Sequence, residues 1–266
     1  MKVTNYTVIL LSLFILGCSD FQKALKNDDV AKKSELASAL YEQGKYRKAT
    51  QLYAQLKETY RGKPQAERIV FFYANSLLES KNHVLAAYEF ETFVKAFPKS
   101  QKADEAYFLM GYAHYLSSPT FSLDQTETQE ALDKLQEFIN RYPESERMEN
   151  ANSMVKELRE KTERKGFEIA KQYNTIRDYK ASITALDNFI ADNPGTSFRE
   201  AALFVQFSAT STLAINSVYY KKEQRLNDAK SKFENFSRLY PNSKHMEKAT
   251  EMMNDIEQEI RTFASN

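Results

Sequence analysis

The chain has 266 residues, with 37 Lys and Arg against 36 Asp and Glu, and therefore a net charge of +1. This balance argues against a nucleic-acid-binding protein, which usually carries a clear excess of basic residues. A single cysteine excludes an intrachain disulfide framework and any zinc site built from several thiolates. Six glycines and six prolines supply too few turns for an all-β fold. We therefore expect an all-α protein.

Residues 1–17 have the pattern of a signal peptide. A basic start at Lys2 precedes an apolar run over 8–16. A helix of that length rises about 14 Å, too little to cross a hydrocarbon core of roughly 30 Å. The run ends at Gly17 and is followed by Cys18, the only cysteine of the chain.

This junction resembles the signal of bacterial lipoproteins, with aliphatic Ile15 and small Gly17 before Cys18. The resemblance implies that the thiol receives a diacylglyceryl group, that the chain is cut after Gly17, and that the new amine is acylated. Several acyl chains hold a soluble domain on a membrane far more durably than one. Ser19 in place of Asp implies sorting to the outer membrane. The alternative is an ordinary secretory signal with an incidental cysteine.

Four of the six prolines lie in one recurring frame, which indicates an internal repeat. Each has a phenylalanine five residues before it and a hydroxyl residue two residues after it. The frame also has a small residue twelve positions before each proline and Leu or Phe eight positions before it. These offsets place the residues before the proline on one stripe of a helix. The prolines, phenylalanines and hydroxyl residues are Pro98, Pro143, Pro194 and Pro241; Phe93, Phe138, Phe189 and Phe236; and Ser100, Ser145, Thr196 and Ser243. A copy without proline precedes them, with Ala49, Tyr53, Leu56 and Tyr60 at the same offsets.

Proline ends a helix because it donates no backbone hydrogen bond and restricts the residue before it. The Ser or Thr that follows is predicted to be the N-cap of the next helix. Each unit is then a helix, a stop and another helix. The prolines are 45, 51 and 47 residues apart, more than the simplest helix pair needs, so some first helices or loops must be longer.

The earliest unit resembles the turn of the tetratricopeptide repeat (TPR), with Gly44 in the tight turn and Tyr41, Tyr46, Ala49 and Tyr53 as packing residues. We expect a TPR-like solenoid of about five helical hairpins over 30–243. A C-terminal capping helix over 244–266 follows, and the lipidated N-terminus with a short tether occupies 18–29.

Three segments depart from a regular repeat. Residues 117–127 are predicted to form a loop that ends in a capping box of Asp124 and Glu127. Residues 146–176 are expected to form one long helix or a helix broken near Gly166. Residues 199–222 are long for a first helix.

Taken together, the lipoprotein signal and the order of the repeats resemble the BamD family, the TPR lipoproteins of the outer-membrane β-barrel assembly machinery. The matching segments are 88–93, 97–100, 104–107, 118–126 and 138–145, and Asn193 departs from the aromatic residue usual before such a proline. The resemblance implies a non-catalytic lipoprotein of the outer membrane that faces the periplasm. Its partners would be a BamA-like barrel assembly subunit, other assembly lipoproteins and unfolded outer-membrane proteins awaiting insertion.

Two sets of residues are candidates for binding. Aromatic residues of the early first helices are candidates for a client groove, with core packing as the alternative: Tyr41, Phe72, Tyr73, Tyr107, Tyr112 and Tyr115. The long loop and a later aromatic and basic segment are candidates for partner contact, with a helix cap and a solvated helix face as the alternatives: Leu123, Asp124, Gln125, Tyr219, Tyr220 and Arg225.

Catalytic motifs are missing from the sequence: it has no phosphate-binding glycine loop, no nucleophile elbow and no zinc helix. His83, His114 and His245 are isolated from one another. We therefore expect no enzyme activity, cofactor, metal or nucleic-acid partner. The rival functions are a lipid-anchored TPR adaptor that organises cell-envelope or peptidoglycan machinery, and a lipid-anchored enzyme.

Overall fold

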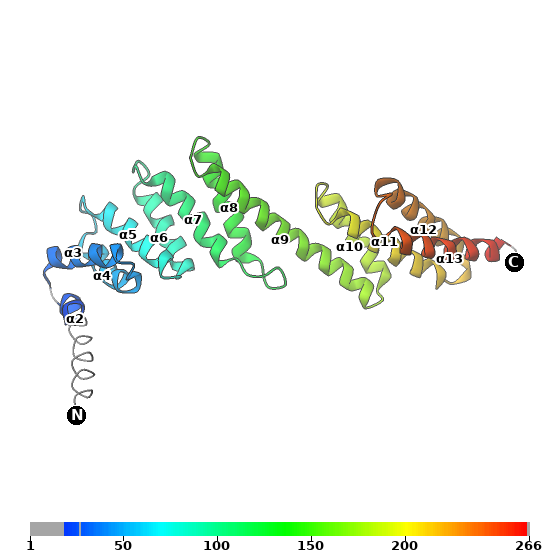
Figure 1. The fold of residues 1–266 in the computed structure, drawn as a ribbon, viewed down its shortest axis with the longest axis horizontal. Helices are drawn as coiled ribbons and strands as arrows, with labels where there is room; N and C mark the ends of the chain where they lie inside the picture. The colour runs from blue at the N-terminus through cyan, green and yellow to red at the C-terminus, as the bar shows by residue number, and fades with distance from the viewer. Residues whose placement is uncertain (1–18, 27, 265–266) are drawn as a thin grey trace, which may run out of the picture. The chain divides into compact units, whose positions relative to one another are not determined.

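The computed structural model describes residues 19–26 and 28–264. The predicted signal peptide, 1–17, and Cys18 lie outside the described residues. Within the described part, the chain forms twelve helices and no strand (Figure 1). The predicted all-α class is confirmed.

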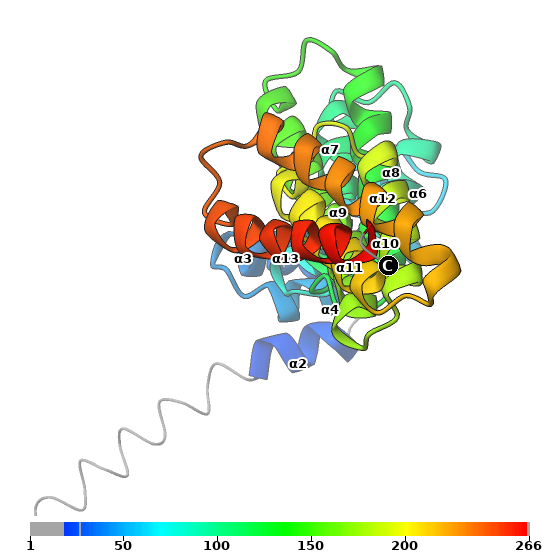
Figure 2. The same cartoon turned by 90° about the vertical axis from the view of Figure 1, so that its right-hand side faces the viewer.

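Ten of these helices form five successive pairs, as expected for TPR-like hairpins. The pairs are α3 (Val30–Glu42) with α4 (Tyr46–Thr59), α5 (Ala66–Glu79) with α6 (His83–Ala96), α7 (Ala103–Ser117) with α8 (Thr126–Arg141), α9 (Met148–Thr175) with α10 (Tyr179–Asp192), and α11 (Arg199–Ile215) with α12 (Tyr219–Leu239). Before them comes α2 (Ser19–Lys26), which packs against α3 and α4. After them comes α13 (Met246–Ala264), which packs against α11 and α12 (Figure 2).

The connections are more regular than the helices. Four hairpin turns have three residues each, 43–45, 80–82, 176–178 and 216–218, whereas the third hairpin has the eight-residue loop 118–125. All five segments that follow a hairpin have six residues: 60–65, 97–102, 142–147, 193–198 and 240–245. The unequal proline spacing therefore comes from that loop and from long helices, chiefly α9 with 28 residues and α12 with 21.

The chain divides into two compact units, and the division falls inside α9. The first unit comprises the described residues up to Pro119 together with Asp124–Leu158. The second comprises Thr120–Leu123 and the described residues from Arg159 onward. The first unit has one core cluster that extends from Phe21 to Leu158. The second has two clusters, one around Phe207 and Phe236 and one around Phe167 and Phe189.

The predicted stripe lies in these cores. Ala86, Phe90 and Phe93 of α6 are fully buried, and so are the corresponding Ala131, Leu135 and Phe138 of α8. Small residues on the stripe permit close approach, and Ser182 Oγ donates to the carbonyl oxygen of Ala170 on α9 at 2.9 Å. Glycine serves the same purpose on a first helix, because a Cβ on Gly111 would lie 2.8 Å from Leu135 Cδ2.

Each recurring proline follows a helix end, as predicted, but the hydroxyl residue has a different role from the predicted N-cap. Ser100 Oγ accepts a hydrogen bond from the Lys102 N–H at 2.9 Å, and it lies three residues before α7 begins at Ala103. The same hydroxyl donates to Glu67 Oε1, in the first turn of α5, at 2.6 Å. We call this contact the hydroxyl–carboxylate bridge.

The hydroxyl–carboxylate bridge recurs along the chain. Ser145 donates to Asp104 Oδ1 at 2.9 Å and Ser243 donates to Glu200 Oε1 at 2.6 Å. In the fourth repeat Thr196 closes the turn, and its neighbour Ser197 donates to Glu160 Oε1 at 3.2 Å. Each bridge connects the segment after a hairpin to the first helix of that same hairpin. A hydrogen bond to a charged acceptor is stronger than a neutral one, so each bridge strengthens the attachment of that segment to its own hairpin.

The two segments expected to be long, 146–176 and 199–222, differ in whether they form one helix. α9 is continuous through Gly166, where a Cβ would lie 3.3 Å from Phe189 Cδ2, so the glycine permits packing and does not break the helix. Residues 199–222 do not form one long helix, because α11 ends at Ile215 and α12 begins at Tyr219. Asn216 Nδ2 and Ser217 Oγ donate to the carbonyl oxygens of Thr212 and Leu213 at 2.8 and 2.6 Å, and such bonds compete with helix continuation.

Candidate functional site

The first candidate surface is an aromatic cluster formed by α3, α4 and α5. The ring of Tyr41 lies 5.0 Å from Phe72 and 5.3 Å from Tyr46, both edge to face, and Tyr53 stacks on Phe72 at 6.1 Å. Arg68 places its guanidinium 5.6 Å from the Phe72 ring. Burial, followed by the nearby Glu79 charge, raises the pKa of Tyr41 to about 12. Tyr41 and Phe72 are half-buried, so they are brought together at an accessible edge of the core.

The turn before this cluster follows the TPR expectation. Gly44 has a φ of 69°, a left-handed conformation that other residues adopt only with strain. Lys81 and Arg177 hold the same place two residues before a second helix, with φ of 67° and 66°. The sequence offers no signal for these two strained positions, since neither is a glycine.

Tyr73 faces away from this cluster. It is buried, and Lys57 Nζ lies 5.1 Å from the centre of its ring. Lys57 also contacts both carboxylate oxygens of Glu89, at 2.6 and 2.8 Å. Burial, with the Glu89 charge as the second cause, raises the pKa of Tyr73. Its place between α4 and α6 matches the core-packing alternative.

The second aromatic cluster belongs to α7. Phe108, Tyr112 and Tyr115 stack in succession, with ring centres 6.1 and 6.2 Å apart. The Tyr115 hydroxyl donates to Glu157 Oε2 on α9 at 2.7 Å, and this bond together with burial raises the pKa of Tyr115 to about 12. Tyr112 and Tyr115 are half-buried and form one surface.

Tyr107, on the same helix, is buried. Tyr142 packs 5.6 Å from its ring and the Arg141 guanidinium lies 4.7 Å from it. These contacts place Tyr107 in the packing between α7 and α8 and not beside Tyr112 and Tyr115.

The third candidate is the loop 118–125. Asp124 Oδ1 accepts from the Thr126 N–H at 2.9 Å, and Gln125 Oε1 accepts from the Thr128 hydroxyl at 2.8 Å, so both side chains organise the start of α8. Glu127, the other expected member of the capping box, has its Oε2 3.2 Å from His114 Nδ1. Leu123 has an exposed side chain, and its carbonyl oxygen accepts from Lys165 Nζ at 2.5 Å.

One contact of this loop was missed by sequence reasoning. The Arg164 guanidinium lies 4.2 Å from the ring centre of Phe121, and both residues belong to the second unit. Phe121 has no periodic pattern around it, so only the fold reveals the pairing.

The fourth candidate is the start of α12. Tyr220 is 80% exposed, and Tyr219 is also exposed, although its ring lies 4.7 Å from that of Phe263 on α13. Arg225 donates to Ser217 Oγ at 2.7 Å. It also lines a hollow of about 510 Å³ between α10, α11 and α12, beside the ion pair of Lys232 and Asp187. The two tyrosines therefore lie exposed at the start of α12, whereas Arg225 bonds the preceding turn and lines the hollow.

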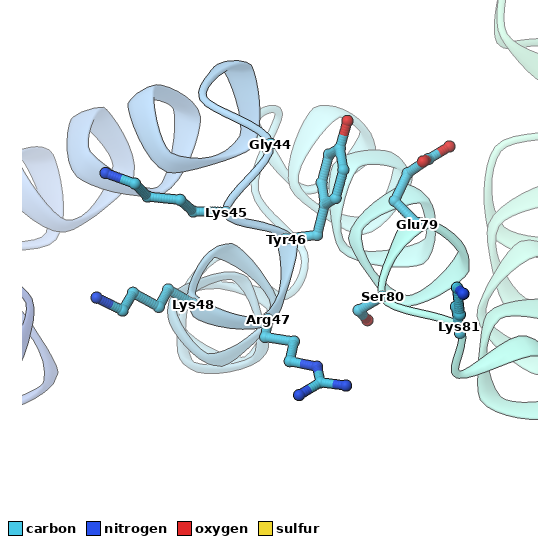
Figure 3. A pocket seen from close by; sticks show the side chains of 8 residues that line it. All are labelled: Gly44, Lys45, Tyr46, Arg47, Lys48, Glu79, Ser80 and Lys81. Carbon is cyan, nitrogen blue, oxygen red and sulfur yellow. The ribbon is translucent and has the colours of Figure 1, made fainter.

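A further hollow, of about 450 Å³, lies between the turns of the first two hairpins (Figure 3). Sequence reasoning missed it, because its basic residues come from two places distant in the chain. Lys45, Arg47 and Lys48 belong to the first hairpin turn and the start of α4, and Lys81 belongs to the second hairpin turn.

Two features are absent from the described residues. No group of three or more His, Cys, Asp or Glu in that part of the chain is arranged to hold a metal ion. None of the helices over 19–26 and 28–264 combines the length and the apolar character that a bilayer crossing requires.

Comparison with known proteins identifies the family. The family model YfiO, described as "Outer membrane lipoprotein", matches residues 31–225 and, in a second match, 173–262. A relative from Helicobacter pylori named "Outer membrane protein assembly factor BamD" is 24% identical over 149 residues. That match covers 53% of this chain and 66% of the relative, so the chain spans just under two thirds of the relative's length.

Solved structures show weaker similarity. The MamA protein is 15% identical, with 80% of this chain and 92% of that chain covered and a TM-score of 0.33. The TPR2AB domain of yeast Sti1, in its complex with Hsp90, is 13% identical, with 89% and 93% covered and a TM-score of 0.39. The family match, in contrast, extends over more than half of the sequence. The chain therefore belongs to the YfiO family of outer membrane lipoproteins.

Proposed function

We propose that this protein is a non-catalytic assembly factor for outer-membrane proteins. The observation that carries the proposal is the family match over 31–225 and 173–262, together with a relative whose name states that role. The same observation favours assembly over the envelope adaptor. The hairpins that stack within the first unit support the proposal physically, because their successive first helices offer an extended surface for a polypeptide.

We propose that Cys18 carries the lipid and that the folded part faces the periplasm. The lipoprotein family supports the anchor, and Cys18 is the only thiol of the chain. Mass spectrometry of the N-terminal peptide tests this point: the expected peptide starts at Cys18 and carries acyl groups. An unmodified thiol at that position would contradict it.

Clients are proposed to bind the two half-buried aromatic clusters of the first unit. Tyr41 and Phe72 form one and Tyr112 and Tyr115 the other. Aromatic faces and edges suit the apolar and aromatic side chains of an extended client segment. Tyr73 and Tyr107, which are buried, are expected to act only through packing.

The BamA-like subunit is proposed to bind the second unit near α12. Tyr220 is the most exposed large hydrophobic side chain among the described residues of that unit, and large exposed aromatic side chains often anchor interfaces. Leu123, also exposed, is a second proposed contact.

Site-specific photocrosslinking tests both assignments. A photoreactive amino acid at Phe72 or Tyr115 should capture unfolded outer-membrane proteins, and one at Tyr220 should capture the barrel assembly subunit. Glu130, on the exposed face of α8, is the matched control position and should capture neither. The proposal fails if the tagged protein co-purifies with no barrel assembly subunit and its depletion leaves outer-membrane protein levels unchanged.

A further inference from the structure

The hollow between the first two hairpin turns is positively charged. Four cations and one acid line it: Lys45, Arg47, Lys48 and Lys81 against Glu79. Figure 3 shows that Lys45 and Lys48 extend to one side and Arg47 to the other, so the cationic ends do not converge on one point. Converging cations would suit a single small anion, whereas diverging ones spread the positive potential over a broad surface.

An apolar patch adjoins these cations. On the first turns of α6, Val84 is 60% exposed, Leu85 44% and Tyr88 61%. With Lys81 they line a second hollow of about 610 Å³, and Lys81 belongs to both hollows. Lysine and arginine beside exposed aliphatic and aromatic side chains are characteristic of protein surfaces that contact the headgroup region of a bilayer.

The N-terminus leads directly to this surface. Lys48, which lines the first hollow, has its Nζ 5.4 Å from the ring of Phe21 on α2. Phe21 is buried against the first unit. Cys18 precedes Phe21 by three residues, which can span at most about 11 Å of extended chain. An acyl anchor at Cys18 would therefore hold a bilayer close to these cations.

We propose that this surface, defined by Lys45, Arg47, Lys81, Val84, Leu85 and Tyr88 and named the basic turn surface, rests on anionic phospholipid headgroups of the membrane that anchors the chain. The cations would contact the phosphates, and the three apolar side chains would enter the boundary below them. Because the surface is positively charged, the complementary lipid is an anionic one. The proposal rests on the lipid anchor proposed above, which the mass of the N-terminal peptide tests separately.

The chain has no tryptophan, so a single introduced tryptophan reports on one place only. The full lipidated protein carrying Tyr88→Trp is reconstituted in vesicles of phosphatidylcholine with phosphatidylglycerol, or of phosphatidylcholine alone. We expect a blue-shifted emission and quenching by brominated lipid in the anionic vesicles. The neutral vesicles should show neither effect, and high salt should abolish both in the anionic vesicles. Tyr220→Trp, at a position that is more exposed (80% against 61% for Tyr88), is the control and should not respond.

Charge reversal supplies the second measurement. K45E, R47E and K81E combined should lower the quenched fraction, with each lost cation worth about fivefold in the lipid contact. Lys63, Lys99 and Lys156, three exposed lysines of the first unit, provide the charge-matched control when changed to Glu. Equal emission of Tyr88→Trp in both vesicle types, or no effect of the triple reversal, would overturn the proposal. A shift produced by polyglutamate but not by vesicles would assign the surface to an acidic polypeptide instead.

Discussion

The two units bury their apolar residues in different ways. In the first unit the core is one continuous cluster from Phe21 to Leu158, to which the helices from α2 to the start of α9 contribute. In the second unit the buried residues form two clusters, and Ile190 is the side chain that packs against both. The second unit also includes the C-terminal part of the 28-residue α9, where Ile169 and Tyr173 are exposed, and the turn after it, where Ile176 is exposed.

This difference shows where neighbouring hairpins share one core and where they do not. Hairpins of similar length place their stripes next to one another, so each new pair extends the same core. In the second unit the boundary between the two clusters falls on α11, where Ala202 belongs to one cluster and Leu203 to the other. We expect the first unit to unfold as one body and the second in two steps.

The largest expected effect comes from truncating the stripe phenylalanine in each unit. Phe138 and Phe236 hold the same repeat position and are fully buried. Each change to Ala should cost about 3–5 kcal/mol. Hydrogen exchange should show Phe138→Ala weakening protection from α3 to α8, but Phe236→Ala weakening only α11–α13 and sparing α10. Equal loss of protection in α10 and α12 would contradict the division of the second core.

The next effect concerns ion pairs of unequal burial. In the first unit Lys57 faces Glu89, whose side chain is 4% exposed, so Lys57→Ala should cost about 3 kcal/mol by leaving a buried carboxylate without its cation. In the second unit Glu259, the partner of Lys222, is 35% exposed, and Lys222→Ala should cost less than about 1 kcal/mol. Urea unfolding measures both. Lys57→Met combined with Glu89→Leu should recover most of the lost free energy of unfolding. If it does not, the loss comes from altered packing and not from the unpaired charge.

A smaller effect is expected at the strained turns, one in each unit. Lys81→Gly and Arg177→Gly remove a left-handed non-glycine residue and should each raise the free energy of unfolding by about 0.5 kcal/mol. Gly44→Ala should lower it by about 1 kcal/mol for the same reason. Thermal unfolding of the three variants against the parent provides the measurement. A destabilised Lys81→Gly would show that the lysine contributes more through its contacts than it loses through strain.

An effect of similar size is a pH dependence in the first unit. The bond to Glu157 raises the pKa of Tyr115 in the folded chain to about 12, above its ordinary value of 10.0. The protonated phenol therefore stabilises the fold fully below pH 10, and this contribution is lost as the pH rises from 10 to 12. Tyr115→Phe should cost about 0.5–1 kcal/mol at pH 8, with a difference that shrinks toward pH 12. Tyr220→Phe, at an exposed position, should leave the free energy of unfolding unchanged both at pH 8 and toward pH 12.

The repeats were predictable because their signal is local. The stripe of Ala86, Phe90 and Phe93 follows helical periodicity, and Gly44 marks a turn that needs a positive φ. The end of α11 was not predictable from that periodicity, since Asn216 and Ser217 act through side-chain bonds that a stripe does not reveal.

The candidate site was only partly predictable, because its residues meet through the fold. From the sequence, Tyr41 and Tyr73 were both candidates for the client groove. In the structure Tyr41 joins an accessible cluster, whereas Tyr73 packs between helices. Adjacent positions on a helix differ by about 100°, so Phe72 and Tyr73 necessarily face different surroundings. The basic turn surface combines Lys45 with Lys81, and no local pattern connects two turns so far apart.

The hydroxyl–carboxylate bridge has a consequence for tracing distant relatives. Its partners are 33, 41 and 43 residues apart in the three direct cases, so the bond persists although hairpin length changes. A paired search for an acidic residue early in one hairpin and a serine just after that hairpin would find repeat borders where proline or the aromatic residue has been lost. Such pairs would let sequences of very different hairpin length be aligned border by border, without gaps placed inside the helices.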